Sequence, residues 1–220
     1  MIITIDGPLG VGKSSVAKEV AKRLGFTYID TGAMYRALAL KTLKKNIDIN
    51  NLENLKKLIE ETDIQLIYEN GSLKVLLDGE DVSEEIRKEE VSKRASEIAT
   101  IKEVRDYMVN LQRKFGEKYK NIVIEGRDTG TVIFPDAELK IFLTAPVEVR
   151  IERRYKQLLE KGFNIDYEKF VKNFMEREVR DKTREINPLR PAEDSVIVDT
   201  GNMSFEEVIN KILILAKERM

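Results

Sequence analysis

The sequence contains neither cysteine nor histidine. The missing cysteine excludes disulfides and thiol chemistry, and the missing histidine excludes an imidazole base and any histidine-ligated metal. No apolar run approaches the ~18 residues that a membrane-spanning helix needs. The sequence begins with an apolar strand, so we expect no signal peptide and a cytoplasmic location.

An excess of one charge sign is also missing, since 38 Lys and Arg residues face 39 Asp and Glu residues and leave a net charge of −1. Without an overall positive field, the chain is not suited to bind nucleic acid or an anionic membrane surface. Its 220 residues are enough for one α/β body with an inserted piece. We expect one compact body with an insert, and separately a monomer that acts on small molecules.

What the sequence does contain is a glycine-rich loop between a β-branched strand, residues 2–6, and a helical stretch, residues 13–24. Glycine permits positive φ, so the loop can turn backbone N–H groups toward a phosphate chain, and the helix N-terminus adds further donors. Lys13 is placed to reach the β- and γ-phosphates, and Ser14 to hold Mg²⁺. A chance glycine-rich turn is the alternative, which the order of strand, loop, Lys-Ser and helix disfavours. The predicted nucleotide-binding residues are Gly7, Pro8, Leu9, Gly10, Val11, Gly12, Lys13, Ser14 and Ser15.

The rest of the chain alternates strand and helix patterns, which predicts an α/β sheet. Apolar strands are expected at 26–29, 122–124, 139–143 and 196–198, and helices at 33–45, 52–59, 146–162, 167–183 and 204–219. Helical spacing also covers 84–118, with a break near Thr100. Between residues 64 and 78 the period changes to two around Asn70-Gly71, which predicts a hairpin. We expect a core at 1–45 and 96–220, with a lid at about 150–184, and a small inserted domain at 46–95.

Three polar clusters remain once the core positions are set aside. Arg127 and Asp128 follow a buried strand, and open α/β sheets bind ligands at the carboxyl ends of strands, although a surface turn is the alternative. Arg177, Asp181 and Arg184 share one helical face, where an exposed salt-bridge ladder is the alternative. The arginines at 150, 153 and 154 can likewise form a solvated face. The clusters are Thr31, Tyr35 and Arg36; Ser96, Arg105, Arg127 and Asp128; and Arg177, Asp181 and Arg184.

Five motifs together resemble bacterial cytidylate kinases over essentially the whole chain. They are Gly7-Pro-Leu-Gly-Val-Gly-Lys-Ser14, Asp30-Thr-Gly-Ala-Met-Tyr-Arg36, Asp78-Gly-Glu-Asp-Val82, Gly126-Arg-Asp-Thr-Gly-Thr-Val132 with Phe134-Pro-Asp136, and the segment from Arg177 to Pro191. The resemblance implies transfer of the γ-phosphoryl group of ATP to CMP or dCMP, with Mg²⁺ as cofactor. It also implies a P-loop NTP hydrolase-type five-stranded parallel sheet flanked by helices, an inserted NMP-binding domain carrying the hairpin, and a helical lid.

The same resemblance assigns roles to residues. It places Ser96, Arg105, Asp128 and Arg184 on the cytosine base, Asp181 on the ribose, and Arg36, Arg127 and Arg177 on the acceptor phosphate. Thr31 and Tyr35 complete the CMP site, and Thr31 replaces the serine of the family pattern with its hydroxyl kept. Lys13, Arg127, Arg153 and Arg154 are the expected catalytic cations.

This chemistry suits a chain without histidine or cysteine, because phosphoryl transfer to an ionised phosphate needs positioning and cations and no base. One alternative is a P-loop kinase for another nucleotide or for a hydroxyl metabolite such as shikimate, with Asp30 or Asp128 as base. Another is a nucleotide-dependent switch or nucleic-acid motor. The sequence has no Asn-Lys-x-Asp stretch for guanine and no basic track for nucleic acid.

Overall fold

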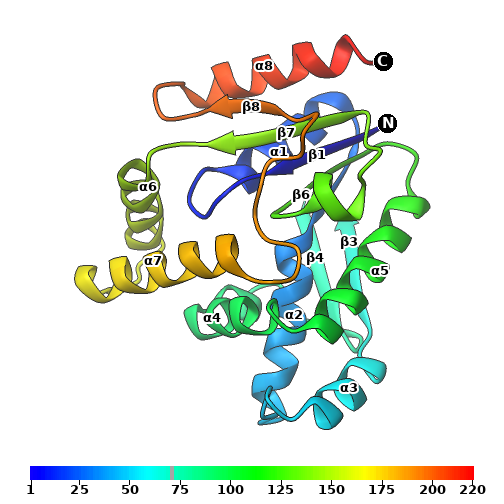
Figure 1. The fold of residues 1–220 in the computed structure, drawn as a ribbon, viewed down its shortest axis with the longest axis vertical. Coiled ribbons are helices and arrows are strands. Elements are labelled where there is room, and N and C mark those ends of the chain that lie inside the picture. Colours follow the sequence, from blue (N-terminus) through cyan, green and yellow to red (C-terminus); the bar gives the residue numbers. More distant parts are fainter. Residues whose placement is uncertain (70–71) are drawn as a thin grey trace. The chain divides into compact units, whose positions relative to one another are not determined.

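A computed structural model describes residues 1–69 and 72–220. The chain forms two compact units (Figure 1). The first comprises Met1–Ile29 and Gly116–Met220, and the second comprises Asp30–Phe115.

The first unit is built on a five-stranded sheet in the order β2-β6-β1-β7-β8. Its strands are β1 (Ile2–Asp6), β2 (Thr27–Asp30), β6 (Ile122–Gly126), β7 (Leu139–Thr144) and β8 (Val196–Asp199). β1 lies at the centre and pairs in parallel with β6 and with β7, and β7 pairs in parallel with β8. Central strands covered on both faces favour apolar residues, as in residues 122–124 of β6, which are buried. The predicted five-stranded parallel sheet flanked by helices is confirmed.

Helices cover this sheet and extend from it (Figure 1). They are α1 (Lys13–Leu24), α6 (Val147–Glu160), α7 (Tyr167–Thr183) and α8 (Phe205–Lys217). α1 contacts both β6 and α8, while α6 packs on α7. The α6–α7 contact has its own apolar cluster, formed by Ile151, Leu158, Phe170 and Phe174.

Local sequence signals explain where these helices begin and end. Ser204 and Glu207 form the predicted capping box of α8, and the side chain of Asp166 caps α7 by accepting from the N–H of Lys169. Gly25 follows α1 in the left-handed conformation, as its C-cap. The bounds of α1 and α7 agree with the residue spacing.

One feature of the first unit has no counterpart in the predicted elements. Residues Thr129–Ile133 form a π-helical turn directly after β6. Both Val132 and Ile133 donate their N–H to the carbonyl of Asp128. Single π-helical turns occur frequently at functional sites.

The second unit has α2 at its centre, in contact with α3, α4, β3 and β4. Its elements are α2 (Thr31–Lys44), α3 (Leu52–Glu60), η1 (Glu85–Arg87), α4 (Glu89–Ile98) and most of α5 (Lys102–Lys118), with the three strands β3 (Ile64–Glu69), β4 (Ser72–Leu77) and β5 (Glu80–Asp81). The predicted break near Thr100 separates α4 from α5.

The hairpin pattern of the second unit corresponds to antiparallel pairing of β3 with β4, in which Ile64 lies opposite Leu77. The predicted turn at Asn70-Gly71 lies outside the described residues. The short strand β5, paired with β4, was not predicted. Residues 46–95, expected as an inserted domain, form part of the larger unit 30–115, because α2 packs against both α3 and α4. Their separate role stays a prediction.

None of the helices in the described ranges is both long and apolar enough to span a bilayer.

Candidate active site

The glycine-rich loop follows β1 as the sequence predicts, and its glycines occupy positions where a side chain would clash or would force a strained backbone. A Cβ on Gly7 would lie 2.4 Å from the carbonyl oxygen of Leu143, and one on Gly10 would lie 2.6 Å from that of Arg150. Gly10 and Gly12 have φ values of 77° and 97°. Gly12 is the N-cap of α1 and provides no side-chain cap, so the N–H groups of the first helical turn stay available for an anion.

Lys13 lies folded back over this loop. Its Nζ donates to the carbonyl of Pro8 at 2.8 Å, and its side chain is buried. Burial, reinforced by the positive charge of Arg127, lowers the pKa of Lys13 to about 7. A polyphosphate placed at the loop would supply the negative charge that favours the protonated lysine.

Ser14 contacts a carboxylate that the sequence analysis did not assign. Its Oγ donates to Oε1 of Glu125 at 2.6 Å, and the hydroxyl of Tyr28 donates to the same oxygen at 3.3 Å. Glu125 lies near the end of β6, the strand beside β1, and its acidic side chain is buried. An acid at the end of a buried strand, directly before Gly126, was the available sequence signal. Hydroxyl and carboxylate oxygens are the donors that Mg²⁺ prefers, so this pair fits the implied cation.

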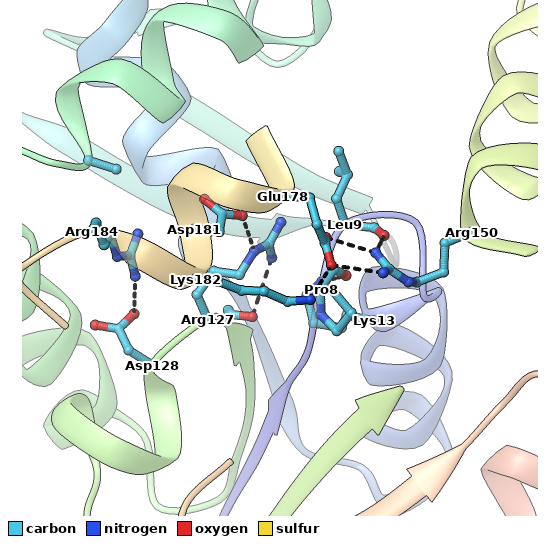
Figure 2. Close-up of polar contacts among 12 residues, drawn as sticks. Pro8, Leu9, Lys13, Arg127, Asp128, Arg150, Glu178, Asp181, Lys182 and Arg184 are labelled. Carbon is cyan, nitrogen blue, oxygen red and sulfur yellow. Dashed lines mark hydrogen bonds and ion pairs between the residues drawn. The ribbon is translucent and has the colours of Figure 1, made fainter. Parts of the chain in front are cut away.

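Two of the predicted acceptor-site carboxylates are buried and paired with arginines in the first unit (Figure 2). Nε of Arg127 donates to Oδ2 of Asp181 at 2.9 Å. Nη2 of Arg184 lies 3.9 Å from Oδ1 of Asp128. Burial alone would raise the pKa of Asp181, but Arg127, Arg177 and Arg184 outweigh it and hold the pKa below its usual value. These residues therefore do not form the exposed salt-bridge ladder considered for this helix.

Arg150 does not lie on a solvated face, which was the alternative considered for the arginines at 150, 153 and 154. It is buried on α6 and makes four hydrogen bonds: Nε to the carbonyl of Ala145, Nη1 to the carbonyl of Leu9 and to Glu178, and Nη2 to Glu178. Figure 2 shows its guanidinium group between the glycine-rich loop and α7. Arg150 thus connects the loop to the helix that carries Asp181.

The other two arginines of this segment lie further out. Arg153 donates to the hydroxyl and the carbonyl of Thr200, just after β8, at 3.0 and 2.7 Å. Arg154 donates to Gln157 of its own helix. Their catalytic role stays a prediction.

The remaining predicted residues belong to the second unit. Asp30 caps α2 by accepting from the N–H of Ala33, and it also accepts from Nη2 of Arg36 at 3.1 Å. The guanidinium of Arg105 lies 5.6 Å from the centroid of the Tyr35 ring, and its Nη1 donates to the carbonyl of Ala99. Thr31 on α2 and Ser96 on α4 are both buried.

The structure therefore groups the predicted site residues by unit. Asp128, Arg177, Asp181 and Arg184 lie with the glycine-rich loop in the first unit, whereas Thr31, Ser96 and Arg105 lie in the second. The four residues expected to read the base are all buried and are divided between the two units: Asp128 and Arg184 belong to the first, and Ser96 and Arg105 to the second.

The family model "Cytidylate kinase" matches residues 3–218. A cytidylate kinase from Caldicellulosiruptor saccharolyticus is 49% identical over 96% of this chain and 93% of its own. A cytidylate kinase from Bacillus subtilis is 46% identical over 96% of this chain and 94% of its own. The similarity covers both compact units and is not confined to the glycine-rich loop.

Solved structures resemble the chain in fold only. A shikimate kinase from Bacteroides thetaiotaomicron has a TM-score of 0.51 at 11% identity, covering 99% of this chain and 98% of its own. An uncharacterized protein from Eubacterium ventriosum has a TM-score of 0.54 at 15% identity, covering 100% of this chain and 99% of its own.

Proposed function

Since the chain belongs to the cytidylate kinase family, we propose that it transfers the γ-phosphoryl group of ATP to CMP or dCMP, giving ADP and CDP or dCDP. The observation that carries this proposal is the cluster beside the glycine-rich loop, in which the buried Asp128 and Arg184 lie together and Arg127 pairs with the buried Asp181. A nucleobase edge and a phosphate are the ligands that such carboxylates and guanidinium groups recognise.

ATP would bind along residues 7–15, with the N–H groups of the loop and of the first turn of α1 on its phosphates. Mg²⁺ would be held by Ser14, the nucleotide phosphates and water, with Glu125 fixing the Ser14 hydroxyl. In this position the cation would neutralise the charge of the β- and γ-phosphates. Lys13 would leave the Pro8 carbonyl and bind the transferring group as an ammonium ion.

The acceptor phosphate would be bound by Arg127, Arg177 and Arg36. Arg127 fits this role because some of its N–H donors have no acceptor in the described chain. Its Nε donates to Asp181, and its Nη1 donates only weakly to the carbonyl of Gly126, at 3.4 Å. Its Nη2 donates to no protein group in the described chain. A guanidinium has five N–H donors, so Arg127 keeps donors for a phosphate.

The base would be read by a donor and acceptor pattern specific to cytosine. Asp128 and Ser96 would accept from the exocyclic amino group, and Arg105 and Arg184 would donate to the ring nitrogen and the carbonyl. Thr31 and Tyr35 would complete the site, and Asp181 would accept from a sugar hydroxyl. Uracil presents a carbonyl where cytosine presents its amino group and would turn an acceptor toward the buried Asp128 carboxylate.

The reaction needs no general base, because the acceptor is already an ionised phosphate. The alternative of a hydroxyl acceptor, as in a shikimate kinase, would need one. Asp30 is poorly suited to that role, because it already accepts from the α2 backbone and from Arg36. Cations therefore supply the catalysis, with Lys13 and Arg127 beside the reacting groups. The lid, at about residues 150–184, would close over the nucleotides and exclude water. Its closure would bring Arg153 and Arg154 to the transferred phosphoryl group.

We further propose that residues 46–95 act as an NMP-binding domain and that the enzyme works as a cytoplasmic monomer. Sedimentation of the purified protein with and without nucleotides checks the oligomeric state. A dimer in both conditions would contradict this part.

The function is tested by coupled measurement of ADP release with CMP, dCMP, UMP, AMP and shikimate. We expect CMP to exceed UMP by about 10² or more in kcat/KM, because each buried polar group left unpaired costs roughly 1 to 3 kcal/mol. Asp128→Ala should reduce this ratio strongly. An unchanged ratio in the variant would show that cytosine is read elsewhere.

Lys13→Ala tests the nucleotide loop separately. Loss of one preorganised electrostatic partner typically lowers the rate by about 10² to 10³. Circular dichroism controls for the fold, and Lys18→Ala, on the exposed face of α1, is a matched lysine control that should keep wild-type turnover. A Lys13→Ala enzyme that kept half of the wild-type kcat would exclude this role.

A further inference from the structure

Asp6 is a buried carboxylate that the sites described so far do not use. It is the last residue of β1, directly before the glycine-rich loop, and only 4% of it is exposed. The parallel register places it beside Gly126 of β6, one residue before Arg127. Its position therefore connects the strand that enters the nucleotide loop with the strand that leads into the predicted acceptor site.

Three hydrogen bonds join Asp6 to the π-helical turn after β6. Oδ1 accepts from the N–H of Thr129 at 2.9 Å and from its hydroxyl at 2.8 Å, and Oδ2 accepts from the N–H of Gly130 at 2.8 Å. All three donors belong to the two residues that follow Asp128. Gly130 itself lies close against the sheet, because a Cβ there would be 2.8 Å from Oγ1 of Thr4. The carboxylate and the sheet together hold the start of the turn in place.

Arg127 and Asp128 directly precede this turn in the chain. The carbonyl of Asp128 accepts from the N–H groups of Val132 and Ile133, so the backbone of Asp128 is part of the turn. We propose that Asp6 is a positioning residue for the acceptor nucleotide, because its bonds to Thr129 and Gly130 fix the segment from which Arg127 and Asp128 extend. This inference rests on the proposed function.

The ionisation of Asp6 agrees with a positional role. Its pKa is raised to about 6, because burial and, to a smaller extent, the charge of Asp128 raise it by more than the hydrogen bonds from Thr129 and Gly130 lower it. Keeping a buried carboxylate ionised at neutral pH is unfavourable for folding. Because this cost is present, we expect the two carboxylate oxygens of Asp6 to be required as hydrogen-bond acceptors. An apolar side chain cannot provide them.

The experiment compares Asp6→Asn with the wild type in steady-state kinetics for CMP, UMP and ATP. The amide places an NH₂ group on one of the three donors. We expect KM for CMP to rise about tenfold or more, the scale of one buried donor left unpaired, and the CMP/UMP ratio of kcat/KM to fall. KM for ATP should change by less than about threefold, since the loop residues themselves are intact.

Glu138→Gln is the matched control, because Oε2 of Glu138 accepts from the N–H of Ile2 at 2.7 Å and so holds the other end of the same strand. It should leave both KM for CMP and the CMP/UMP ratio unchanged. Thr129→Ala removes only the hydroxyl donor and should raise KM for CMP by a smaller factor, which Thr129→Ser should restore.

The ratio of two substrates does not depend on the fraction of folded enzyme, so partial unfolding of a variant does not obscure it. If Asp6→Asn cannot be purified folded, the Thr129 pair decides. The inference is overturned if Asp6→Asn changes KM for ATP and KM for CMP equally, or if it leaves the CMP/UMP ratio of kcat/KM unchanged. If only the Thr129 variants fold, it is overturned when Thr129→Ala has no effect on KM for CMP. Failure of the proposed function is a separate result, because then the wild type itself would not phosphorylate CMP.

Discussion

Arg150 and Arg127 pair with carboxylates three residues apart on α7, and the two guanidinium groups differ in how many of their N–H donors the protein uses. Arg150 uses four of its five donors on Glu178, Leu9 and Ala145. Arg127 has one short bond to Asp181 and one long bond to its neighbour Gly126. A saturated guanidinium holds elements together, whereas one with unused donors can bind an incoming anion.

The partner carboxylates differ in the same way. Glu178 is bound by Arg150 and also by Lys182 of its own helix, at 2.8 Å. Asp181 has one hydrogen-bonded arginine and the charges of Arg177 and Arg184 around it. We therefore propose that one turn of α7 carries a structural pair and a ligand-binding pair, and replacing each arginine in turn separates the two roles.

The largest expected effect is the loss of catalytic activity when Arg127 is replaced by Met. Removing a preorganised cation from the acceptor phosphate should lower kcat/KM for CMP by about 10² to 10³. The melting temperature should fall less than in Arg150→Met, because Arg177 and Arg184 still compensate the charge of Asp181. Steady-state kinetics and calorimetry measure both quantities. If Arg127→Met keeps a kcat/KM near that of the wild type, Arg127 has a structural role, as Arg150 does, and does not bind the acceptor phosphate.

Arg150→Met should show the reverse pattern. Breaking one partner of a buried pair costs about 3 to 5 kcal/mol of unfolding free energy, and for a chain of this size each kcal/mol shifts the melting temperature by about 2 to 4 °C. Turnover per folded enzyme should fall less than in Arg127→Met. The double variant Arg150→Met with Glu178→Leu is the control and should regain much of the stability, since the only charge that loses its partner is then the exposed Lys182. A single variant as stable as the wild type would contradict the structural role.

The dependence of the unfolding free energy on pH in the acid range should also distinguish the Arg150–Glu178 pair from the Arg127–Asp181 pair. Burial alone would raise the pKa of Glu178, but Arg150 and Lys182 outweigh it, so the folded pKa lies below 4.5. A lowered folded pKa stabilises the protein above the unfolded value, and this contribution is lost as the pH falls below about 4.5 through the folded pKa. Glu178→Gln should therefore flatten the dependence of unfolding free energy on pH in that range.

Asp181→Asn should have a similar but separate effect below 3.8, because the arginines around Asp181 hold its pKa down against burial. Urea unfolding at a series of pH values measures both slopes. KM for CMP should rise only in the Asp181 variant, and a rise in the Glu178 variant would remove the distinction between the pairs.

The smallest expected effect concerns the sugar. Asp181 is proposed to accept from a ribose hydroxyl, and deoxyribose keeps part of that interaction. The loss of one hydrogen bond corresponds to roughly 1 kcal/mol, so KM values for CMP and dCMP should agree within about tenfold. The coupled assay with both substrates measures this. No detectable turnover of dCMP at millimolar concentration would show that the 2′-hydroxyl is required.

Local sequence signals determined much of this protein. The glycine-rich loop, the bounds of α1 and the capping box of α8 depend on residues within a few positions of one another, where backbone conformation and capping decide the result. The apolar strands and the break between α4 and α5 follow from periodicity in the same way. The motif residues Lys13, Ser14, Arg127 and Asp128 could be named from the sequence because they follow strand ends, where an open α/β sheet collects its ligand-binding groups.

The contacts that organise the site were decided only by the tertiary structure. Ser14 meets Glu125 across 111 positions of the sequence, and Asp6 meets Thr129 across 123. A solvated face was one of the alternatives for the segment with Arg150, whereas its pairing with Glu178 depends on how α6 packs on α7. Periodicity indicates which face of an element is apolar, but it carries no information about which distant carboxylate meets a buried cation. That choice depends on the strand order and helix packing, which bring Glu125 beside the nucleotide loop and Glu178 onto Arg150.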